Sequence, residues 1–340
     1  MDRSASLPSS PSSPSLPTPG PAEPARPAGS SALARAERFV WLSARVLEQR
    51  RFAYHFLGGG AEAVETALTA YLGTDGGYGH ALDPDLRGPV SQPPHAVHAL
   101  RVLDGIGRCG GQRVERLCRY LTSVSTPDGA LPVCHPSPHG YPAAPWVPSA
   151  DDPRGDLLTT GPVVGLLHRN EVWHAWLFRA TDFCWAAVAA LAEGGAALRP
   201  YEVAAAVAFL DGAPDRARAE AAAERLGRRV REERLIVPSP VPGSAEDRPV
   251  PRPAEDRPLP PEPGEPLQVH DIARTPGSPA RRWFTDAEVE RSLDALVAAQ
   301  QEDGGWPPHR RAWTPGATLE WRSVATIEAL LTLRAYGRRI

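Results

Sequence analysis

The apolar positions between residues 34 and 336 recur every three to four residues, which is the period of an amphipathic helix. The clearest stripe runs from Trp173 to Leu191 and contains tryptophan, leucine, alanine, cysteine and valine. We find no convincing strand pattern, so the sequence predicts an all-α protein. We expect about ten helices, near residues 34–57, 63–72, 93–107, 112–124, 160–167, 173–191, 200–211, 214–235, 285–301 and 323–336.

Local signals indicate where several of these helices begin and end. Gly58-Gly59-Gly60 ends the first helix, because glycine adopts the backbone conformation that closes a helix. Pro93-Pro94 opens the third, because proline fits the first helical turn, where the backbone N–H has no partner. Thr160 is expected to cap the short helix after the long Pro/Gly loop.

An internal repeat organises the helices into pairs. In three segments a helix runs into an Asp-Gly turn, a loop follows, and a second helix comes after the loop. The turns are Asp75-Gly76-Gly77-Tyr78-Gly79, Asp128-Gly129-Ala130-Leu131-Pro132 and Asp303-Gly304-Gly305-Trp306-Pro307. Glycine ends an outer helix at each turn, and the chain doubles back as an inner helix. A helix pair cannot bury its apolar face alone, so we expect a toroid or solenoid of helical hairpins.

Two proline-rich stretches interrupt the helical pattern. Residues 1–30 hold eight prolines and eight serines, and residues 238–266 hold 11 prolines. Both have too little apolar surface to offset the entropy lost on ordering. We therefore predict a disordered tail over 1–33 and one toroid domain over 34–340, with 238–266 as a disordered Pro-rich insertion. The insertion could bind a protein partner as a polyproline II segment, and the alternative is a tolerated insertion without a ligand.

Composition excludes several classes of protein. The net charge of -3 gives no dominant basic field, so we expect no nucleic-acid partner. No lysine is present, which removes Schiff-base chemistry and a P-loop lysine. No apolar run reaches the roughly 20 residues of a membrane span, and the N-terminus has no secretory signal. Four cysteines without a CxxC pair are typical of reduced thiols, so we predict a cytoplasmic protein.

The third repeat carries a family resemblance. Its segment from Gln300 to Trp306 resembles the QW repeat of squalene–hopene cyclases and the wider prenyltransferase/squalene oxidase repeat family. The first repeat departs from the pattern, with Leu72 and Tyr78 at the glutamine and tryptophan positions. The resemblance implies an α/α toroid with a central apolar cavity. It does not by itself imply cyclase activity, because the same fold hosts prenyltransferases, glycan-acting enzymes and non-catalytic binders.

Asp83-Pro84-Asp85-Leu86 resembles the Asp-x-Asp-Asp motif with which class II terpene cyclases protonate an alkene or epoxide. The segment lies in the first repeat's loop, just before a predicted inner helix. The resemblance implies that Asp83 and Asp85 supply the acid, since burial and a like-charged neighbour favour a neutral carboxyl. Leu86 replaces the last aspartate of the motif. The alternative is that both carboxylates bond to loop amides or pair with Arg87.

Two histidine positions are further catalytic candidates. His98 lies one turn beyond His95 on the third predicted helix, so one of the two would face the cavity if that helix is inner. A core or surface histidine is the alternative. His270-Asp271 follows the Pro-rich insertion, where it either anchors the chain on the toroid or forms an acid–base pair.

The loop 306–322 collects aromatic and charged side chains. Its tryptophan faces, with a carboxylate nearby, suit a carbocation or a sugar ring. The alternative is that the tryptophans simply bury the loop. The candidate ligand-binding residues are Tyr78, Trp306, Trp313, Trp321 and Arg322.

No local pattern predicts a metal or cofactor site. Cys134-His135 is an isolated pair, and Asp151-Asp152 does not continue into a magnesium-binding DDxxD. We therefore predict neither zinc nor magnesium, and no cofactor.

These observations leave three hypotheses for the function. The leading one is a terpene cyclase- or prenyltransferase-like toroid that binds a hydrophobic isoprenoid ligand in a central cavity, with proton-initiated cyclisation as the reaction. The second is a glycan-acting barrel enzyme, with Asp83 or Asp85 opposite Glu320 or Asp271 as acid and base. The third is a non-catalytic binding toroid.

Overall fold

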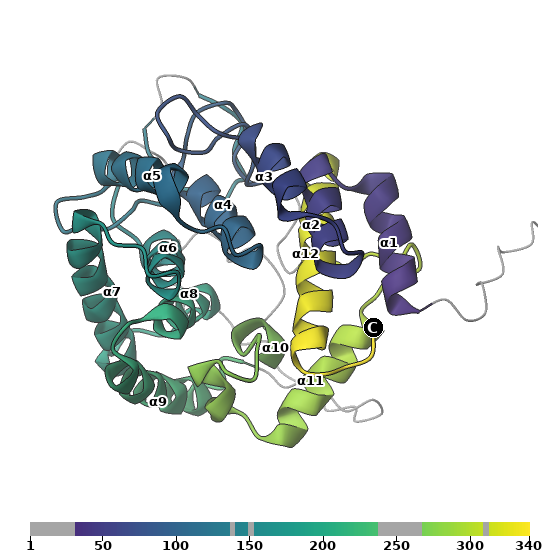
Figure 1. Ribbon diagram of the computed structural model, residues 1–340. Coiled ribbons are helices and arrows are strands. Elements are labelled where there is room, and N and C mark those ends of the chain that lie inside the picture. Colours follow the sequence, from purple (N-terminus) through teal and green to yellow (C-terminus); the bar gives the residue numbers. More distant parts are fainter. Residues whose placement is uncertain (1–30, 137–139, 149–152, 237–266, 309–312) are drawn as a thin grey trace, which may run out of the picture.

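The chain forms two concentric layers of helices that close into a ring (Figure 1). The structure is a computed structural model, and it describes residues 31–136, 140–148, 153–236, 267–308 and 313–340. Within these ranges the regular elements are all helical, and extended pairing is limited to isolated β-bridges. The predicted all-α toroid is confirmed.

Outer and inner helices alternate along the chain, as the repeat predicts (Figure 1). The outer helices are α1 (Ala32–Ser43), α3 (Ala61–Thr69), α5 (Gly111–Val124), α7 (Ala175–Glu193), α9 (Arg216–Glu232) and α11 (Asp286–Ala298). The inner helices are α2 (Val46–Phe56), α4 (Pro93–Gly105), α6 (Leu157–Arg169), α8 (Pro200–Gly212), α10 (Val269–Ile272) and α12 (Pro315–Ala335). A 3₁₀ helix, η1 (Pro279–Trp283), lies between α10 and α11.

The single helix expected over 34–57 is wrong, because the chain breaks at Ala44 and Arg45. Both residues have extended backbone, with ψ of 154° and 158°. Ser43 donates to the carbonyl of Phe39, and Arg45 turns its side chain onto Glu48 in the next helix. The break sends the chain from the outer layer into the inner one.

A second element that the pattern missed is α10, which has only four residues. With it, and with α1 separated from α2, the described residues hold 12 α-helices rather than the ten expected. The C-terminal inner helix α12 packs against the N-terminal helices α1 and α2 (Figure 1). The two ends of the chain thereby complete the ring.

The turn of the third repeat stabilises the closed ring. Gln300 Nε2 donates to the carbonyls of Ala32 and Gly304, each at 2.9 Å, so it ties the α11–α12 turn to the start of α1. Gly304 has φ +94°, and a Cβ there would lie 2.1 Å from the Arg35 carbonyl oxygen. Only glycine fits this position. Trp306 is buried beside the turn and donates from Nε1 to the Leu296 carbonyl at 2.7 Å.

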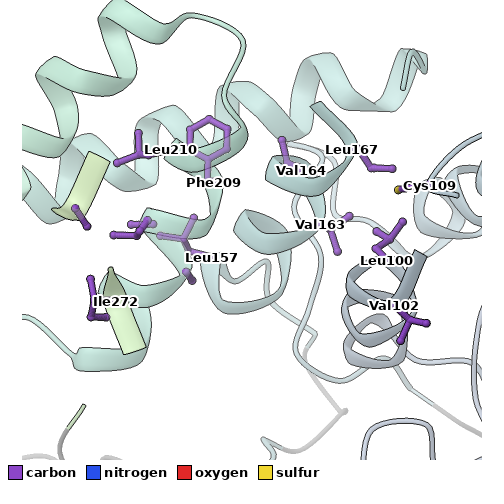
Figure 2. Close-up of a cluster of buried hydrophobic side chains, with 14 of the residues drawn as sticks. Leu100, Val102, Cys109, Leu157, Val163, Val164, Leu167, Phe209, Leu210 and Ile272 are labelled. Atoms are coloured by element: carbon purple, nitrogen blue, oxygen red, sulfur yellow. The ribbon is translucent and has the colours of Figure 1, made fainter. Parts of the chain in front are cut away.

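The closest packing in the ring is between the inner helices α6 and α8. A Cβ on Gly165 would lie 2.2 Å from the Ala208 carbonyl oxygen, and one on Gly212 would lie 1.8 Å from that of Gly165. Glycine therefore lets the two backbones touch. Figure 2 shows the apolar side chains that fill the space around this contact, among them Val164 and Phe209.

The start of α6 differs from the prediction. Asp156, not Thr160, caps the helix, because its carboxylate accepts from Leu158 N at 2.7 Å. Thr160 lies one turn further on, where its hydroxyl accepts from Leu131 N at 2.8 Å. That bond joins the helix to the turn of the second repeat.

Two further predictions concern the proline-rich segments and membrane spans. The predicted tail over 1–33 and the insertion 238–266 lie almost wholly outside the described residues. Among the described helices, α7 is long and apolar enough to cross a membrane, as judged by length and composition alone. Within the 18-residue stretch of α7 that meets this criterion, 33% is buried inside the protein. The sequence analysis expected no membrane span, because the apolar run from Phe183 to Leu198 is broken by Glu193, Gly194 and Gly195.

Candidate functional site

The loop between α3 and α4 brings the Asp83–Asp85 segment to one end of the inner layer. Asp75 shapes the start of the loop: its Oδ1 accepts from Gly77 N at 2.9 Å and from Ser91 Oγ at 2.7 Å. Further on, His80 and Ala81 have left-handed backbone, with φ 54° and 58°. Such strain persists only where the surroundings hold it. Here Arg45 Nη1 donates to the Ala81 carbonyl at 3.0 Å.

Asp83 and Asp85 are both buried, with 8% and 3% of their surface exposed. Asp83 Oδ1 accepts from Asp85 N at 2.9 Å, which closes a local turn. Asp85 Oδ1 accepts from Trp321 Nε1 at 2.9 Å, and Asp85 Oδ2 accepts from Trp146 Nε1 at 3.4 Å. Two indoles from distant parts of the chain thus hold one carboxylate.

Two histidines of α4 stand behind this loop, and both are uncharged at neutral pH. His95 Nδ1 accepts from Asp83 N at 2.8 Å, which places the ring proton on Nε2. Burial, followed by the charges of Arg45 and His80, lowers the pKa of His95 to about 3. Burial, followed by Arg45 and Arg51, holds the pKa of His98 well below its ordinary value.

His98 reaches the centre of the site. Its Nε2 is buried and has no hydrogen-bond partner among the described residues. It lies 3.8 Å from Glu48 Oε1, and the His98 and Trp321 rings are 6.4 Å apart. A neutral imidazole in this position can accept or relay a proton.

Ion pairs neutralise the arginines around the loop. Glu48 is fully buried, and its carboxylate accepts hydrogen bonds from Arg45 Nε and Nη2, each at 2.9 Å. Glu320 pairs with Arg87, with 3.1 and 3.0 Å between the nitrogens and oxygens, and lies 3.8 Å from Arg45. The guanidinium groups of Arg45 and Arg87 are therefore each paired with a carboxylate.

The structure brings together Asp83, Asp85, His98, Glu320 and Trp321 from the predicted set. It gives His270 and Asp271 other contacts: His270 Nδ1 lies 2.7 Å from Ser292 Oγ, and Asp271 closes the capping box of α10. His270 Nε2 also lies 3.8 Å from Asp271 Oδ1, so the anchoring role and the acid–base role both stay predictions.

The remaining predicted ligand-binding residues have mixed positions. Tyr78 and Trp306 are buried in the core, and Arg322 forms a double ion pair with Asp303, with both bonds at 2.7 Å. Trp313 is half-buried, directly after residues 309–312, which lie outside the described ranges. Among the described contacts of these residues, that of Trp321 reaches the Asp83–Asp85 loop.

Sequence reasoning missed Arg45, Glu48, Arg51 and Trp146 as parts of the site. The only signal for the first three was charge at positions 45, 48 and 51 of a segment assigned to one amphipathic helix. Charged residues are almost never fully buried without a partner, but their burial depends on the break before Arg45, which the pattern did not predict.

Comparison with known proteins gives matches at the level of structure. No family model and no curated protein matches the chain. A solved structure of a protein from Actinoplanes is similar over 90% of this chain and 89% of its own, with 19% identity and a TM-score of 0.51. At this identity the similarity shows a shared fold.

A second solved structure is a variant of the type II terpene cyclase MstE from Scytonema in complex with its substrate, geranylgeranyl dihydroxybenzoate. It matches 88% of this chain and 86% of its own, with 12% identity and a TM-score of 0.47.

Proposed function

We propose that the protein binds a hydrophobic, isoprenoid-type ligand against the inner helices beside the Asp83–Asp85 loop, and that this loop donates the proton that starts a cyclisation. The observation that carries the proposal is the buried pair of aspartates between α2, α4 and α12, with Asp85 held by the indoles of Trp321 and Trp146. The Gln300–Trp306 and Asp83–Asp85 resemblances point to the same chemistry.

The surroundings suit a developing positive charge. Protonation of an alkene leaves a carbocation, which the face of a tryptophan stabilises. His95 and His98 are neutral, and Arg45 is compensated by Glu48, so the site adds little repulsion of its own. The buried His98 Nε2 has room for a proton when a cyclised cation collapses to an alkene.

The two aspartates have different tasks in this proposal. Asp85 is engaged by an indole at each oxygen, so it positions Trp321 and the loop. Asp83 has one oxygen bonded to Asp85 N, and its other oxygen has no hydrogen bond among the described residues. Asp83 is therefore the carboxyl from which a proton can leave toward a ligand.

The test is a product assay with a matched set of variants. The purified protein is incubated with squalene and with geranylgeranyl-bearing alkenes, and the products are resolved by chromatography and mass. We expect an isomer of the substrate that disappears in Asp83→Asn and persists in Asp182→Asn, an exposed aspartate on α7. Product formation unaffected by Asp83→Asn would exclude the acid role. Ligand binding without any product would favour a non-catalytic toroid.

A further inference from the structure

Two aromatic side chains lie on the outer side of the ring, at the start of α7 (Figure 1). Trp173 is 80% exposed and Phe178 is 62% exposed, although both side chains are large and apolar. Their ring centroids are 6.3 Å apart in an edge-to-face arrangement, so they form one contiguous patch. Single apolar residues are normal on a protein surface, whereas a contiguous apolar patch marks an interaction site.

The outward face of α7 continues this patch with small side chains. The face consists of the exposed residues that recur at helical spacing, namely Ala175, Phe178, Arg179, Asp182, Ala186 and Ala190. Glu193, at the C-terminal end of α7, lies 4.0 Å from Arg225 of α9. The bulk of the face is therefore at its N-terminal end, and alanines make its C-terminal half flat.

Two opposite charges lie near the middle of the outward face. Arg179 and Asp182 are both exposed and are one helical turn apart. Arg179 Nη1 donates to the Pro127 carbonyl at 3.2 Å, and a guanidinium has further N–H groups to offer. The carboxylate of Asp182 has no hydrogen bond or ion pair among the described residues. It is therefore available to a cation from outside the molecule.

The order of side chains along this face fits an antiparallel copy of the same helix. A two-fold axis beside the middle of α7 places Trp173 of one copy opposite Ala190 of the other, because both lie equally far from that axis. The same axis brings each Arg179 within about one turn of the second copy's Asp182. The bulky end thus meets the flat end and each charge meets its opposite, which is the self-complementarity that an isologous interface requires.

We propose that the outward face of α7, together with Trp173, is the interface of a homodimer in which the two α7 helices pack antiparallel. Trp173 and Phe178 anchor the contact, and Arg179 and Asp182 set its register. A lipid surface suits this face less well, because charged side chains at the centre of a helix are costly in hydrocarbon. The inference is independent of the proposed ligand.

The size of the face sets the expected strength of the dimer. The two aromatic side chains together can bury about 300 Å² per copy. A stable interface buries about 800 Å² per partner, so the alanine surface adds to a contact that stays small. We therefore expect a dissociation constant in the micromolar range.

The experiment measures the mass of the full chain by sedimentation equilibrium over the micromolar range, where the monomer has 36.5 kDa. The variants each change one feature of the face, and they are Trp173→Glu, Phe178→Glu, Arg179→Glu, Asp182→Arg and the double variant Arg179→Glu/Asp182→Arg. The matched control is Leu42→Glu, which places the same charge on a 76% exposed residue of α1. Thermal unfolding establishes that each variant folds. Asp182→Arg remains informative if Arg179→Glu disturbs the fold, because Asp182 has no described contact to lose. Flotation with phosphatidylcholine–phosphatidylglycerol vesicles tests binding to lipid.

We expect a monomer–dimer equilibrium whose dissociation constant rises at least tenfold in Trp173→Glu or Phe178→Glu and stays within threefold in Leu42→Glu. Each single charge reversal should also weaken the dimer at least tenfold, because it acts twice in a symmetric interface. The double variant should return to within threefold of the wild type, since opposite charges face each other again.

Three results would overturn the proposal. The first is a monomer at every concentration, and flotation of this monomer with the vesicles, lost in Trp173→Glu, would assign the face to lipid instead. The second is a dimer that Leu42→Glu weakens while the α7 variants leave it unchanged, since the interface would then lie elsewhere. The third is a double variant no stronger than the single reversals, which would contradict the antiparallel pairing of Arg179 with Asp182.

Discussion

Trp321 donates from its indole Nε1 to the carboxylate of Asp85 at 2.9 Å, across 236 positions of sequence. The bond links the first repeat's loop to the inner helix that closes the ring. It also places an indole ring beside the only Asp-Pro-Asp segment of the chain. The candidate site therefore exists only in the closed ring.

Replacement of Trp321 by phenylalanine keeps the aromatic ring and removes the N–H. We expect a loss of about 1–3 kcal/mol of folding free energy, because Asp85 would lose a donor in a buried place. Denaturant unfolding followed by circular dichroism measures this. Trp173→Phe is the control, since Trp173 is 80% exposed. Equal stability of the Trp321→Phe variant and the wild type would mean that the bond is not formed in solution.

The two aspartates should differ in their tolerance of asparagine. At position 83 an asparagine keeps the Oδ1 acceptor that Asp85 N uses. At position 85 one oxygen becomes an NH₂ group that faces an indole N–H, since both oxygens accept from tryptophans. We expect Asp85→Asn to be less stable than Asp83→Asn by about 1–3 kcal/mol. Thermal melting curves of the two variants, measured side by side, test this order of stability. A less stable Asp83→Asn would contradict the hydrogen bonds described for the two carboxylates.

Acid should destabilise the protein through its buried histidines. Burial, with Arg45 and His80, lowers the pKa of His95 from 6.5 to about 3. Between these two values the unfolded chain binds a proton at His95 and the folded chain does not. The contribution of neutral His95 to the free energy of unfolding is fully present above pH 6.5. It declines as the pH falls toward 3, by at most about 1.4 kcal/mol per pH unit.

The variant that isolates this effect is His95→Asn, which retains an acceptor for Asp83 N but does not titrate. Its stability should fall less steeply than that of the wild type between pH 6 and 4. The half-buried His135, replaced by asparagine, is the control, because it lies outside the charges that act on His95. Parallel pH profiles for wild type and His95→Asn would show that His95 is protonated in the folded protein.

Adding one methyl group at the contact of α6 with α8 should destabilise the protein. In Gly165→Ala the new Cβ would lie 2.2 Å from the Ala208 carbonyl oxygen, so the helices must separate. We expect a loss of about 1–3 kcal/mol, as for other overpacked cores. Gly316→Ala is the matched control within α12, since its Cβ meets nothing within 4 Å. There alanine should slightly stabilise the helix. Equal melting temperatures for both variants would contradict the packing.

Local chemistry along the chain determined most of the architecture. The helical period, the proline at the start of α4 and the Asp-Gly turns predicted the all-α class and the alternation of outer and inner helices. These signals are readable because each depends on residues within one or two turns of helix. The same holds for the Gln300–Trp306 segment, whose glycine is required by its own positive φ.

The tertiary structure alone decided what the helices surround. At the break, Arg45 bonds to the distant Ala81, and at the start of α6 the backbone of Asp156 bonds to the distant Leu131, while the four-residue α10 is too short to carry a periodic signal. The site depends on them as well, because burial of Glu48 and Arg51 follows from the break. A sequence pattern records which side chains are charged. Whether a charge meets water, a counter-ion or an indole from 236 residues away is decided only when the ring closes.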